Sequence, residues 1–437
     1  MTTAAPAPPP TAPDLATLWR LIVQAGGMKA YVDARLEERG FLVVRRDADA
    51  MSDREKDAYK KELKQEAEER RKLRREAWAA YKANHVVHLG EGVFWTDEVR
   101  EDKWDTPNSE ERAAENELPA LDKPEQLAEA LGVTVPQLRG MAYHRDAATS
   151  LHYVRFTIPK RDGTERPIWA PKKRLKAAQR WILQNIVERL PVHGAAQGFL
   201  AGRSILTNAA VHVNAKIILK MDIKEFFPTV TVRRVKGVFR RAGYRDGIAT
   251  LLSQICTEAP REVVELDGKT YYVSLGPRCL PQGAPTSPAL TNALCLRLDR
   301  RLAGLAKRYG WRYTRYADDM TFSLPAEHAG PPKLGAVMGC VRRIVAAEGF
   351  EVKDDKTRVH RTGGRQAVTG LVVNGDGEPR ASRTLRRQLR SAIHKLKTGK
   401  PLKEGETVAR LHGYAAFVYM TDPKLGKKLL ADLNGVE

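Results

Sequence analysis

The stretch Arg315-Tyr316-Ala317-Asp318-Asp319-Met320-Thr321-Phe322 places two adjacent carboxylates between flanks of aromatic, β-branched and apolar residues. Such flanks favour two short strands, and the Asp pair favours the turn that joins them. Because neighbouring strand residues point to opposite faces, we expect Asp318 to be a principal metal ligand and Asp319 a more peripheral one.

A second Asp pair shows that the doublet alone says little. Asp354-Asp355 lies in the charged run Glu351-Val352-Lys353-Asp354-Asp355-Lys356, which is typical of a solvated turn. The surroundings of Asp318-Asp319 therefore have to supply the evidence for a site.

A single Asp at the end of an apolar run is the first part of that evidence. The run Lys216-Ile217-Ile218-Leu219-Lys220-Met221-Asp222 has the composition of a buried central strand. Asp222 at its exit is either a site residue or the N-cap of the next helix, since Asp is a favoured N-cap.

Three carboxylates in one cleft would repel one another by roughly 4 kcal/mol per close pair at an effective dielectric of about 20, unless cations lie between them. Oxygen ligands without His or Cys favour a hard cation, and Mg²⁺ typically binds one or two carboxylates together with substrate phosphates. Two such ions can activate a 3′-hydroxyl and stabilise a leaving pyrophosphate. The three acids therefore predict nucleotidyl transfer.

The segment between the two acidic sites, Leu280-Pro281-Gln282-Gly283-Ala284-Pro285, is a Pro/Gly loop ahead of a leucine-rich helix. Its Gly lets a backbone approach a ligand closely, although a plain structural loop has the same composition. In the order Asp222, Gln282-Gly283, Asp318-Asp319, the chain resembles the palm of a reverse transcriptase. That resemblance implies an α+β right-hand polymerase fold with fingers, palm and helical thumb, preceded by a mainly helical N-terminal extension.

The resemblance also implies roles for the palm residues. In reverse transcriptases, two Mg²⁺ ions are held by the Asp that ends the first palm strand and by the first Asp of the Tyr-X-Asp-Asp box, which correspond to Asp222 and Asp318. Asp319 lies beside them, and the backbone carbonyl of Ile223 completes one coordination shell. Lys356 matches the later palm Lys that protonates the departing pyrophosphate.

Two further features match the nucleotide-binding parts of this family. Phe227, five residues after Asp222, corresponds to an aromatic whose ring crowds a 2′-hydroxyl, so deoxynucleotides are preferred and an RNA-directed RNA polymerase is disfavoured; a core aromatic is the alternative. The stretch Phe156 to Ile168 predicts a hairpin with an Arg-Asp-Gly-Thr turn. It resembles the fingers hairpin, in which Lys160 and Arg166 would bind the triphosphate. A solvated basic turn is the competing interpretation.

Two motifs indicate a branch of the family. Asn208-Ala209-Ala210-Val211-His212 precedes the first Asp strand, and Val368-Thr369-Gly370 follows the palm. Each is weak alone, but together they resemble the Asn-Ala-X-X-His and Val-Thr-Gly signatures of bacterial retron reverse transcriptases, which implies an RNA-binding role for both. A retron enzyme copies its own structured non-coding RNA from the 2′-hydroxyl of an internal guanosine. The branched RNA-DNA product stays bound, and retrons serve antiphage defence, often with a separate effector.

Composition agrees with a nucleic-acid partner. The formal net charge is +21, which favours binding of a polyanion. From Arg383 to Lys400, leucines and isoleucine recur at helical spacing beneath a basic face. That face contains Arg386, Arg387 and Arg390 and would track a phosphate backbone in the manner of a polymerase thumb; a solvated basic surface is the alternative.

Length and composition outline the rest of the chain. We expect a disordered tail with a small helical packet (1–50), a charged helix and acidic linker (51–118), fingers and palm (119–374) and a basic thumb (375–437). The four Cys show no metal-ligand spacing and fit a reducing bacterial cytoplasm. No membrane span is predicted.

Two other functions stay open at the level of the sequence. A group II intron-like or other bacterial reverse transcriptase would keep the chemistry and change the biology. A non-catalytic RNA-binding scaffold would keep only the fold, although the presence of all three acids and of Gln282-Gly283 argues against it.

Overall fold

Four antiparallel strands form the central sheet of the computed structural model, which describes residues 14–96, 106–159, 163–375 and 377–435. Their order is β7 (Arg312–Tyr316), β8 (Asp319–Pro325), β4 (Ala215–Ile223) and β9 (Val352–Arg361). The strand β4 pairs along both edges, which confirms the central strand that its apolar composition predicts.

The strands of this sheet show where Asp222 and the Asp354-Asp355 pair lie. Asp222 lies inside β4, and the next helix, α9 (Val232–Ala242), has Thr231 as its N-cap residue, so Asp222 does not cap a helix. Asp354 and Asp355 are exposed, as expected, but they lie in strand β9 and not in a turn.

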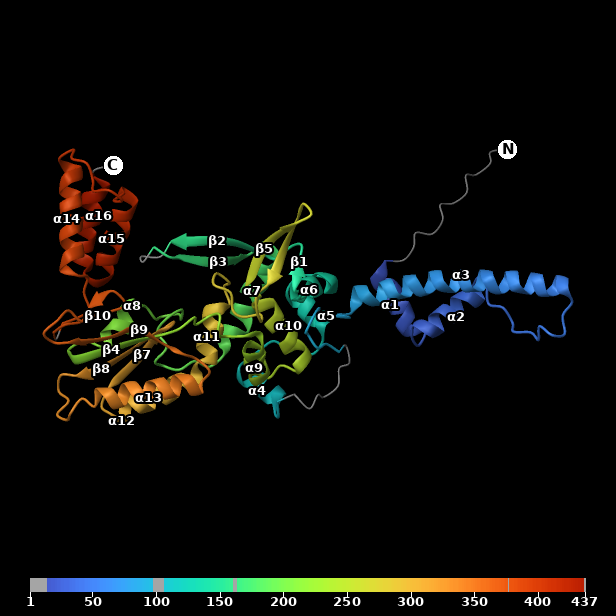
Figure 1. The fold of residues 1–437 in the computed structure, drawn as a ribbon, viewed down its shortest axis with the longest axis horizontal. Coiled ribbons are helices and arrows are strands. Elements are labelled where there is room, and N and C mark those ends of the chain that lie inside the picture. Colours follow the sequence, from blue (N-terminus) through green and yellow to red (C-terminus); the bar gives the residue numbers. More distant parts are fainter. Residues whose placement is uncertain (1–13, 97–105, 160–162, 376, 436–437) are drawn as a thin grey trace.

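The two faces of the sheet pack against different elements. Ile217, Leu219 and Met221 join the main core, and α12 (Leu296–Arg308) and α13 (Leu334–Ala347) pack against β7 and β9 (Figure 1). Ile218 packs on the other face with α8 (Ile205–Ala210) and the hairpin β10 (Ala367–Val368) to β11 (Leu371–Val372). By strand alternation, Asp222 shares this second face.

The rest of the central unit mixes helices with a three-stranded sheet, β1-β6-β5, and the predicted hairpin, β2-β3. Its strands are β1 (Ala147–Ala148), β2 (Tyr153–Pro159), β3 (Glu165–Pro171), β5 (Arg261–Leu266) and β6 (Lys269–Ser274). Its helices are α4 (Ser109–Glu115), α5 (Pro124–Ala130), α6 (Val135–Ala142), α7 (Lys173–Asn185), a 3-10 turn (Val187–Arg189), α10 (Asp246–Cys256) and α11 (Ser287–Leu294). The expected leucine-rich helix after the Gln282-Gly283 loop is divided at Cys295 into α11 and α12.

The N-terminal helices form a unit with its own core, which lies at one end of the molecule (Figure 1). The elements are α1 (Leu15–Gln24), α2 (Met28–Glu38) and α3 (Asp53–Asn84), and Ser52 opens α3 with a capping box to Glu55. Leu73 and Ala77 of α3 pack against the first two helices. The expected boundary between residues 50 and 51 therefore divides a single packed unit, because the apolar stripe of the charged helix needs α1 and α2 to cover it.

The C-terminal helices form a third unit, built from α14 (Arg383–Lys397), α15 (Val408–Thr421) and α16 (Pro423–Asn434). Leu389 and Ile393 of α14 supply part of its core, as their helical spacing predicts. Among the described helices, none combines the length and apolarity that crossing a membrane requires.

A fully buried ion pair ties the central sheet to the helices behind it. Arg315 of β7 binds Asp299 of α12 with Nη2 to Oδ2 at 2.6 Å and Nε to Oδ1 at 2.8 Å. The hydroxyl of Tyr313 donates to the same carboxylate at 2.8 Å. Arg315 also donates to Asn292 Oδ1 at 3.2 Å and to the carbonyl oxygen of Ala317, in the β7-β8 turn, at 3.0 Å.

Replacement of Asp299 by Ala should therefore lower the free energy of unfolding by about 3 to 5 kcal/mol, because it leaves the Arg315 guanidinium buried and unpaired. Urea unfolding followed by tryptophan fluorescence measures the loss. Asp355→Ala, whose side chain is 73% exposed, is the control and should change stability by about 0.5 kcal/mol or less. Equal effects of the two substitutions would contradict the structural role of the pair.

Candidate active site

Three carboxylates meet at one end of the β4-β8 pair. Asp222 is paired directly with Asp319, and Asp318 lies in the turn between β7 and β8. Ala317 opens that turn in the left-handed region, with φ of 55°. The backbone N–H of Ile223 donates to the carbonyl oxygen of Asp318 at 3.0 Å, which fixes the turn against the end of β4.

Two lysines compensate this negative charge. Lys220 Nζ lies 2.8 Å from Asp319 Oδ2, and Lys356 Nζ lies 2.9 Å from Asp222 Oδ2. Lys356 was expected near the site, whereas Lys220 was not. Its position two residues before Asp222 on the same strand, and hence on the same face, is the signal that could have identified it.

The acids occupy an unfavourable electrostatic environment. Burial raises the pKa of Asp318, and the neighbouring Asp222 and Asp319 carboxylates raise it further. Burial also raises the pKa of Asp319, although the Lys220 ammonium opposes that shift. Buried like charges of this kind favour binding of a cation.

The donor set fits a hard metal ion that arrives with phosphate. Within the described ranges, no group of three or more His, Cys, Asp or Glu side chains is arranged to hold a metal by itself. Asp222 and Asp319 instead bind lysines in this structure. Because Mg²⁺ needs only one or two protein carboxylates when substrate phosphates complete its shell, the all-oxygen set remains suitable for it.

The Gln282-Gly283 loop is fixed to the β2-β3 hairpin. The N–H of Trp169 in β3 donates to the carbonyl oxygen of Gln282 at 2.7 Å. Gly283 has φ of 121°, and a Cβ there would lie 2.8 Å from the carbonyl oxygen of Trp169. Only glycine fits this close approach. Arg166 is exposed on β3, and Lys160 lies outside the described residues.

Phe227 follows β4 and is half-buried. Its ring centroid lies 5.8 Å from that of Phe226, which is buried and packs 5.6 Å from Phe350. One part of the ring therefore packs on the core, and another part is accessible.

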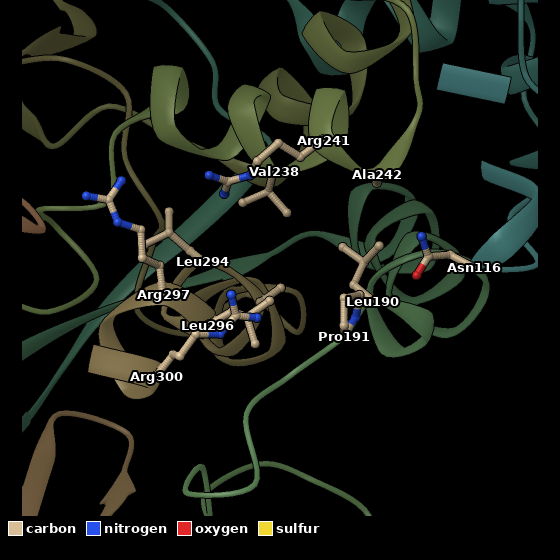
Figure 2. Close-up of a pocket in the computed structure, with 11 residues that line it drawn as sticks. Asn116, Leu190, Pro191, Val238, Arg241, Ala242, Leu294, Leu296, Arg297 and Arg300 are labelled. Atoms are coloured by element: carbon tan, nitrogen blue, oxygen red, sulfur yellow. The ribbon is translucent and has the colours of Figure 1, made fainter. Parts of the chain in front are cut away.

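A separate hollow lies between α9, the start of α12 and the Leu190-Pro191 segment (Figure 2). Apolar side chains such as Val238 and Leu294 line it together with Arg241, Arg297 and Arg300. Arg297 pairs with Glu348 at 3.0 Å. The residues that line this hollow include no carboxylate and no nucleophile, so it does not compete with the acidic cluster as the candidate active site.

The Asn208 and His212 motif is buried and forms a polar network with Thr369. Asn208 is 1% and His212 0% exposed. Each group in the network donates to the next. Ser323 Oγ donates to His212 Nδ1 at 2.7 Å, and His212 Nε2 donates to Thr314 Oγ1 at 2.7 Å. Thr314 Oγ1 donates to Asn208 Oδ1 at 2.6 Å, Asn208 Nδ2 donates to Thr369 Oγ1 at 3.4 Å, and Thr369 Oγ1 donates to the carbonyl oxygen of Ile205 at 3.0 Å. Because Thr314 donates to Asn208, it accepts from His212, which assigns the proton of a neutral imidazole to Nε2.

The Asn208–His212 and Val368–Gly370 motifs were expected to bind RNA, but most of their side chains are buried. Asn208, Ala209, His212 and Val368 are buried, so their side chains contact protein and are not displayed to a nucleic acid. The turn of Thr369 (φ 46°) and Gly370 (φ 89°) is partly exposed. On α14, Arg387 and Arg390 are exposed and Arg386 is half-buried, which fits both a nucleic-acid-binding face and a solvated basic surface.

Comparison with known proteins identifies the family of the chain. Residues 158–385 match the family described as "Reverse transcriptase (RNA-dependent DNA polymerase)". The chain is 54% identical over 428 residues to the retron Mx162 reverse transcriptase of Myxococcus xanthus, which covers 96% of this chain and 88% of that protein. The chain belongs to the retron reverse transcriptases.

Other retron reverse transcriptases are also similar. The Mx65 enzyme of Myxococcus xanthus is 47% identical over 312 residues, covering 71% of each chain. The Ec86 enzyme of Escherichia coli is 31% identical over 322 residues, covering 73% of this chain and 91% of that enzyme. The predicted family is thereby confirmed, and this retron reverse transcriptase is an RNA-directed DNA polymerase with the mixed helix and sheet expected of a polymerase fold.

Replacement of His212 by Ala should lower the free energy of unfolding by about 2 to 4 kcal/mol at neutral pH, because it leaves buried hydroxyl groups without partners. His394→Ala, on the exposed side of α14, is the control. Urea unfolding compares the two variants, and similar small losses would contradict the role of the network.

The same residue predicts a pH dependence. Burial lowers the pKa of His212 to about 3 from an ordinary value of 6.5, so between these values the unfolded chain binds a proton that the folded chain does not. The stabilising contribution is complete above pH 6.5 and is lost as the pH falls toward 3, by up to about 1.4 kcal/mol per pH unit. The difference in unfolding free energy between the unaltered enzyme and His212→Ala should therefore shrink from pH 7.5 to pH 5.5.

Proposed function

We propose that this retron reverse transcriptase copies its own structured non-coding RNA into single-stranded DNA that remains joined to the RNA. Priming from the 2′-hydroxyl of an internal guanosine would give the branched product. The observation that carries the proposal is the meeting of Asp222, Asp318 and Asp319 at the end of the β4-β8 pair, in a chain whose relatives are retron enzymes. Deoxynucleoside triphosphates and the cognate RNA are the implied substrate and template.

Asp222, Asp318 and the backbone carbonyl of Ile223 would hold two Mg²⁺ ions, with Asp319 beside them. Bound there, the ions would activate the attacking hydroxyl and stabilise the departing pyrophosphate. The ion pair with Lys220 holds Asp319 in place. Lys356 Nζ lies 2.9 Å from Asp222 Oδ2 in this structure, so it is close enough to the acids to donate a proton to the departing pyrophosphate.

The nucleotide would bind between the acids and the β2-β3 hairpin. Arg166 is exposed on that hairpin and offers a planar cation to a phosphate, and Lys160 would add a second positive charge. The Gln282-Gly283 loop supports this arrangement because its backbone hydrogen bond couples it to β3. We assign fingers and palm to residues 119–374 and the thumb to residues 375–437.

The thumb would track the RNA backbone with the exposed Arg387 and Arg390 of α14, together with Arg386. Asn208 and His212 would assist RNA binding indirectly, by holding the Thr369-Gly370 turn through the buried network. A bacterial cytoplasmic location, antiphage defence and a separate effector protein complete the proposal, by analogy with the retron family.

Asp318→Asn should abolish incorporation of deoxynucleotides on the cognate RNA, with a loss of about a thousandfold or more, because it removes a charged metal ligand. The second Asp pair provides the matched control: Asp354→Asn changes an exposed carboxylate that pairs with Arg342 at 2.8 Å and should leave activity within twofold. Primer extension with both purified variants measures the effect. Full synthesis by a folded Asp318→Asn enzyme would exclude the proposed site.

Phe227→Ala should increase the use of ribonucleotides relative to deoxynucleotides by tenfold or more, because it removes the ring that would crowd a 2′-hydroxyl. The kcat/KM ratio for dGTP and GTP on one template measures this preference. Phe94→Ala, which removes a 78% exposed aromatic ring from a segment ahead of the central sheet, serves as the control. An unchanged ratio in an active Phe227→Ala enzyme would leave Phe227 as a core residue only.

A further inference from the structure

The long helix α3 separates its charges onto different faces. Three acids near its middle lie on the side that meets the segment between α2 and α3 and are bound by arginines of that segment. The pairs are Arg46 to Glu62 at 3.0 Å, Arg45 to Glu66 at 3.0 Å and Arg39 to Glu69 at 2.5 Å. A further pair links Arg70 of the helix to Asp33 of α2 at 2.5 Å. The folded unit thus neutralises much of its own negative charge.

The outer face of the second half of α3 keeps its positive charge. Arg71, Arg74, Arg75 and Lys82 are exposed, and the described part of the chain provides none of them with a carboxylate at ion-pair distance. At 100° per residue these positions fall on one stripe of the helix, opposite the buried Leu73, Ala77 and Ala80. We call this row, together with Trp78, the basic stripe.

Aromatic rings are stacked along the same stripe. Trp78 is 43% exposed, and its ring lies parallel to that of Tyr81, with an angle of 10° and centroids 5.1 Å apart. Tyr81 in turn stacks on His85, with an angle of 11° and centroids 4.1 Å apart. Trp19 of α1 contacts both Tyr81 and His85 edge-on and supports the stack from behind. The exposed end of the stack is therefore a supported flat ring among cations.

We propose that the basic stripe binds a single-stranded segment of nucleic acid, with its cations on backbone phosphates and a base on Trp78. Proteins that bind single strands combine these two features, and stacking on an aromatic tolerates any base. A membrane would need an apolar helix face, but the apolar face of α3 is buried against α1 and α2. A protein partner is the less suitable occupant, since Trp78 is the single large apolar side chain exposed between Arg71 and Lys82.

The proposal does not depend on the catalytic assignment. The stripe belongs to the N-terminal unit, which has its own core, and it contains none of the residues placed in the active site. The Asp318→Asn enzyme should therefore bind an oligonucleotide through the stripe as the unaltered enzyme does, so failure of one proposal would not be mistaken for failure of the other.

The test measures binding of the full-length chain to fluorescein-labelled 15-nucleotide oligouridylate and oligothymidylate by anisotropy. One variant replaces the four cations of the stripe by Gln: Arg71→Gln, Arg74→Gln, Arg75→Gln and Lys82→Gln. A matched variant removes four exposed cations elsewhere on the same unit: Lys29→Gln, Arg54→Gln, Lys61→Gln and Lys72→Gln. Trp78→Ala and Trp78→Phe test the stacking ring separately.

We expect the stripe variant to raise Kd at least tenfold and to make the salt dependence of binding less steep, while the matched variant changes Kd by less than threefold. Trp78→Ala should raise Kd at least fivefold, and Trp78→Phe should restore it. A 4-thiouridine oligomer should crosslink to residues 71–85. If the stripe variant binds only the RNA oligomer more weakly, the stripe binds template RNA. If it binds only the DNA oligomer more weakly, the stripe binds the DNA product. Weaker binding of both would show that the stripe recognises features that RNA and DNA share.

Two results would overturn the proposal. Equal losses in the stripe and matched variants would show an effect of net charge alone. Unchanged Kd values together with no crosslink to residues 71–85 would exclude a nucleic acid and leave a protein partner as the remaining explanation for the exposed ring. Circular dichroism of each variant at equal concentration verifies that the helices are retained.

Discussion

The register of β4 against β8 is the constraint on which the active site depends. It sets Asp222 opposite Asp319 and brings the Asp318 turn to the end of β4. A slip of one residue would turn Asp222 to the other face of the sheet and separate the acids. Burial of the apolar face of the sheet disfavours such a slip. The buried ion pair between Arg315 and Asp299 disfavours it further, because a displaced β7 would leave both charges buried and unpaired.

Successive side chains of β7 point to opposite faces of the sheet, so contacts on both faces fix its position. Arg315 points to α12, where it meets Asp299, whereas its neighbour Thr314 points to α8, where it meets His212 and Asn208. A buried polar network is favourable only when its members are satisfied together. The site is therefore placed by two networks that contain none of its own carboxylates, and the positioning of the acids does not rest on the acids themselves.

Local patterns in the sequence were enough to predict the helices and strands. They were not enough to predict contacts between residues that are distant in the sequence. The strand that contains Asp222, the hairpin at residues 156–168 and the basic helix that begins at Arg383 follow from composition and spacing within a few residues. The pairing of Lys220 with Asp319 joins positions 99 residues apart, and the burial of His212 depends on strands more than a hundred residues away. A motif recognised by its letters thus gave the family correctly, but it did not show that its side chains face inward.

The active site and the N-terminal unit have one feature of their charge distribution in common. Near the active site, burial raises the pKa of Asp318 and Asp319, so the fold holds these acids at a free-energy disadvantage that Lys220 only partly offsets. A ligand that binds only the native site and supplies positive charge will stabilise the fold in proportion to its affinity. In α3 the internal acids already have their arginines, and the unmatched charge is the positive stripe outside. In both places the charges inside the fold are paired at least in part, and a ligand of opposite charge can bind the charge that is left.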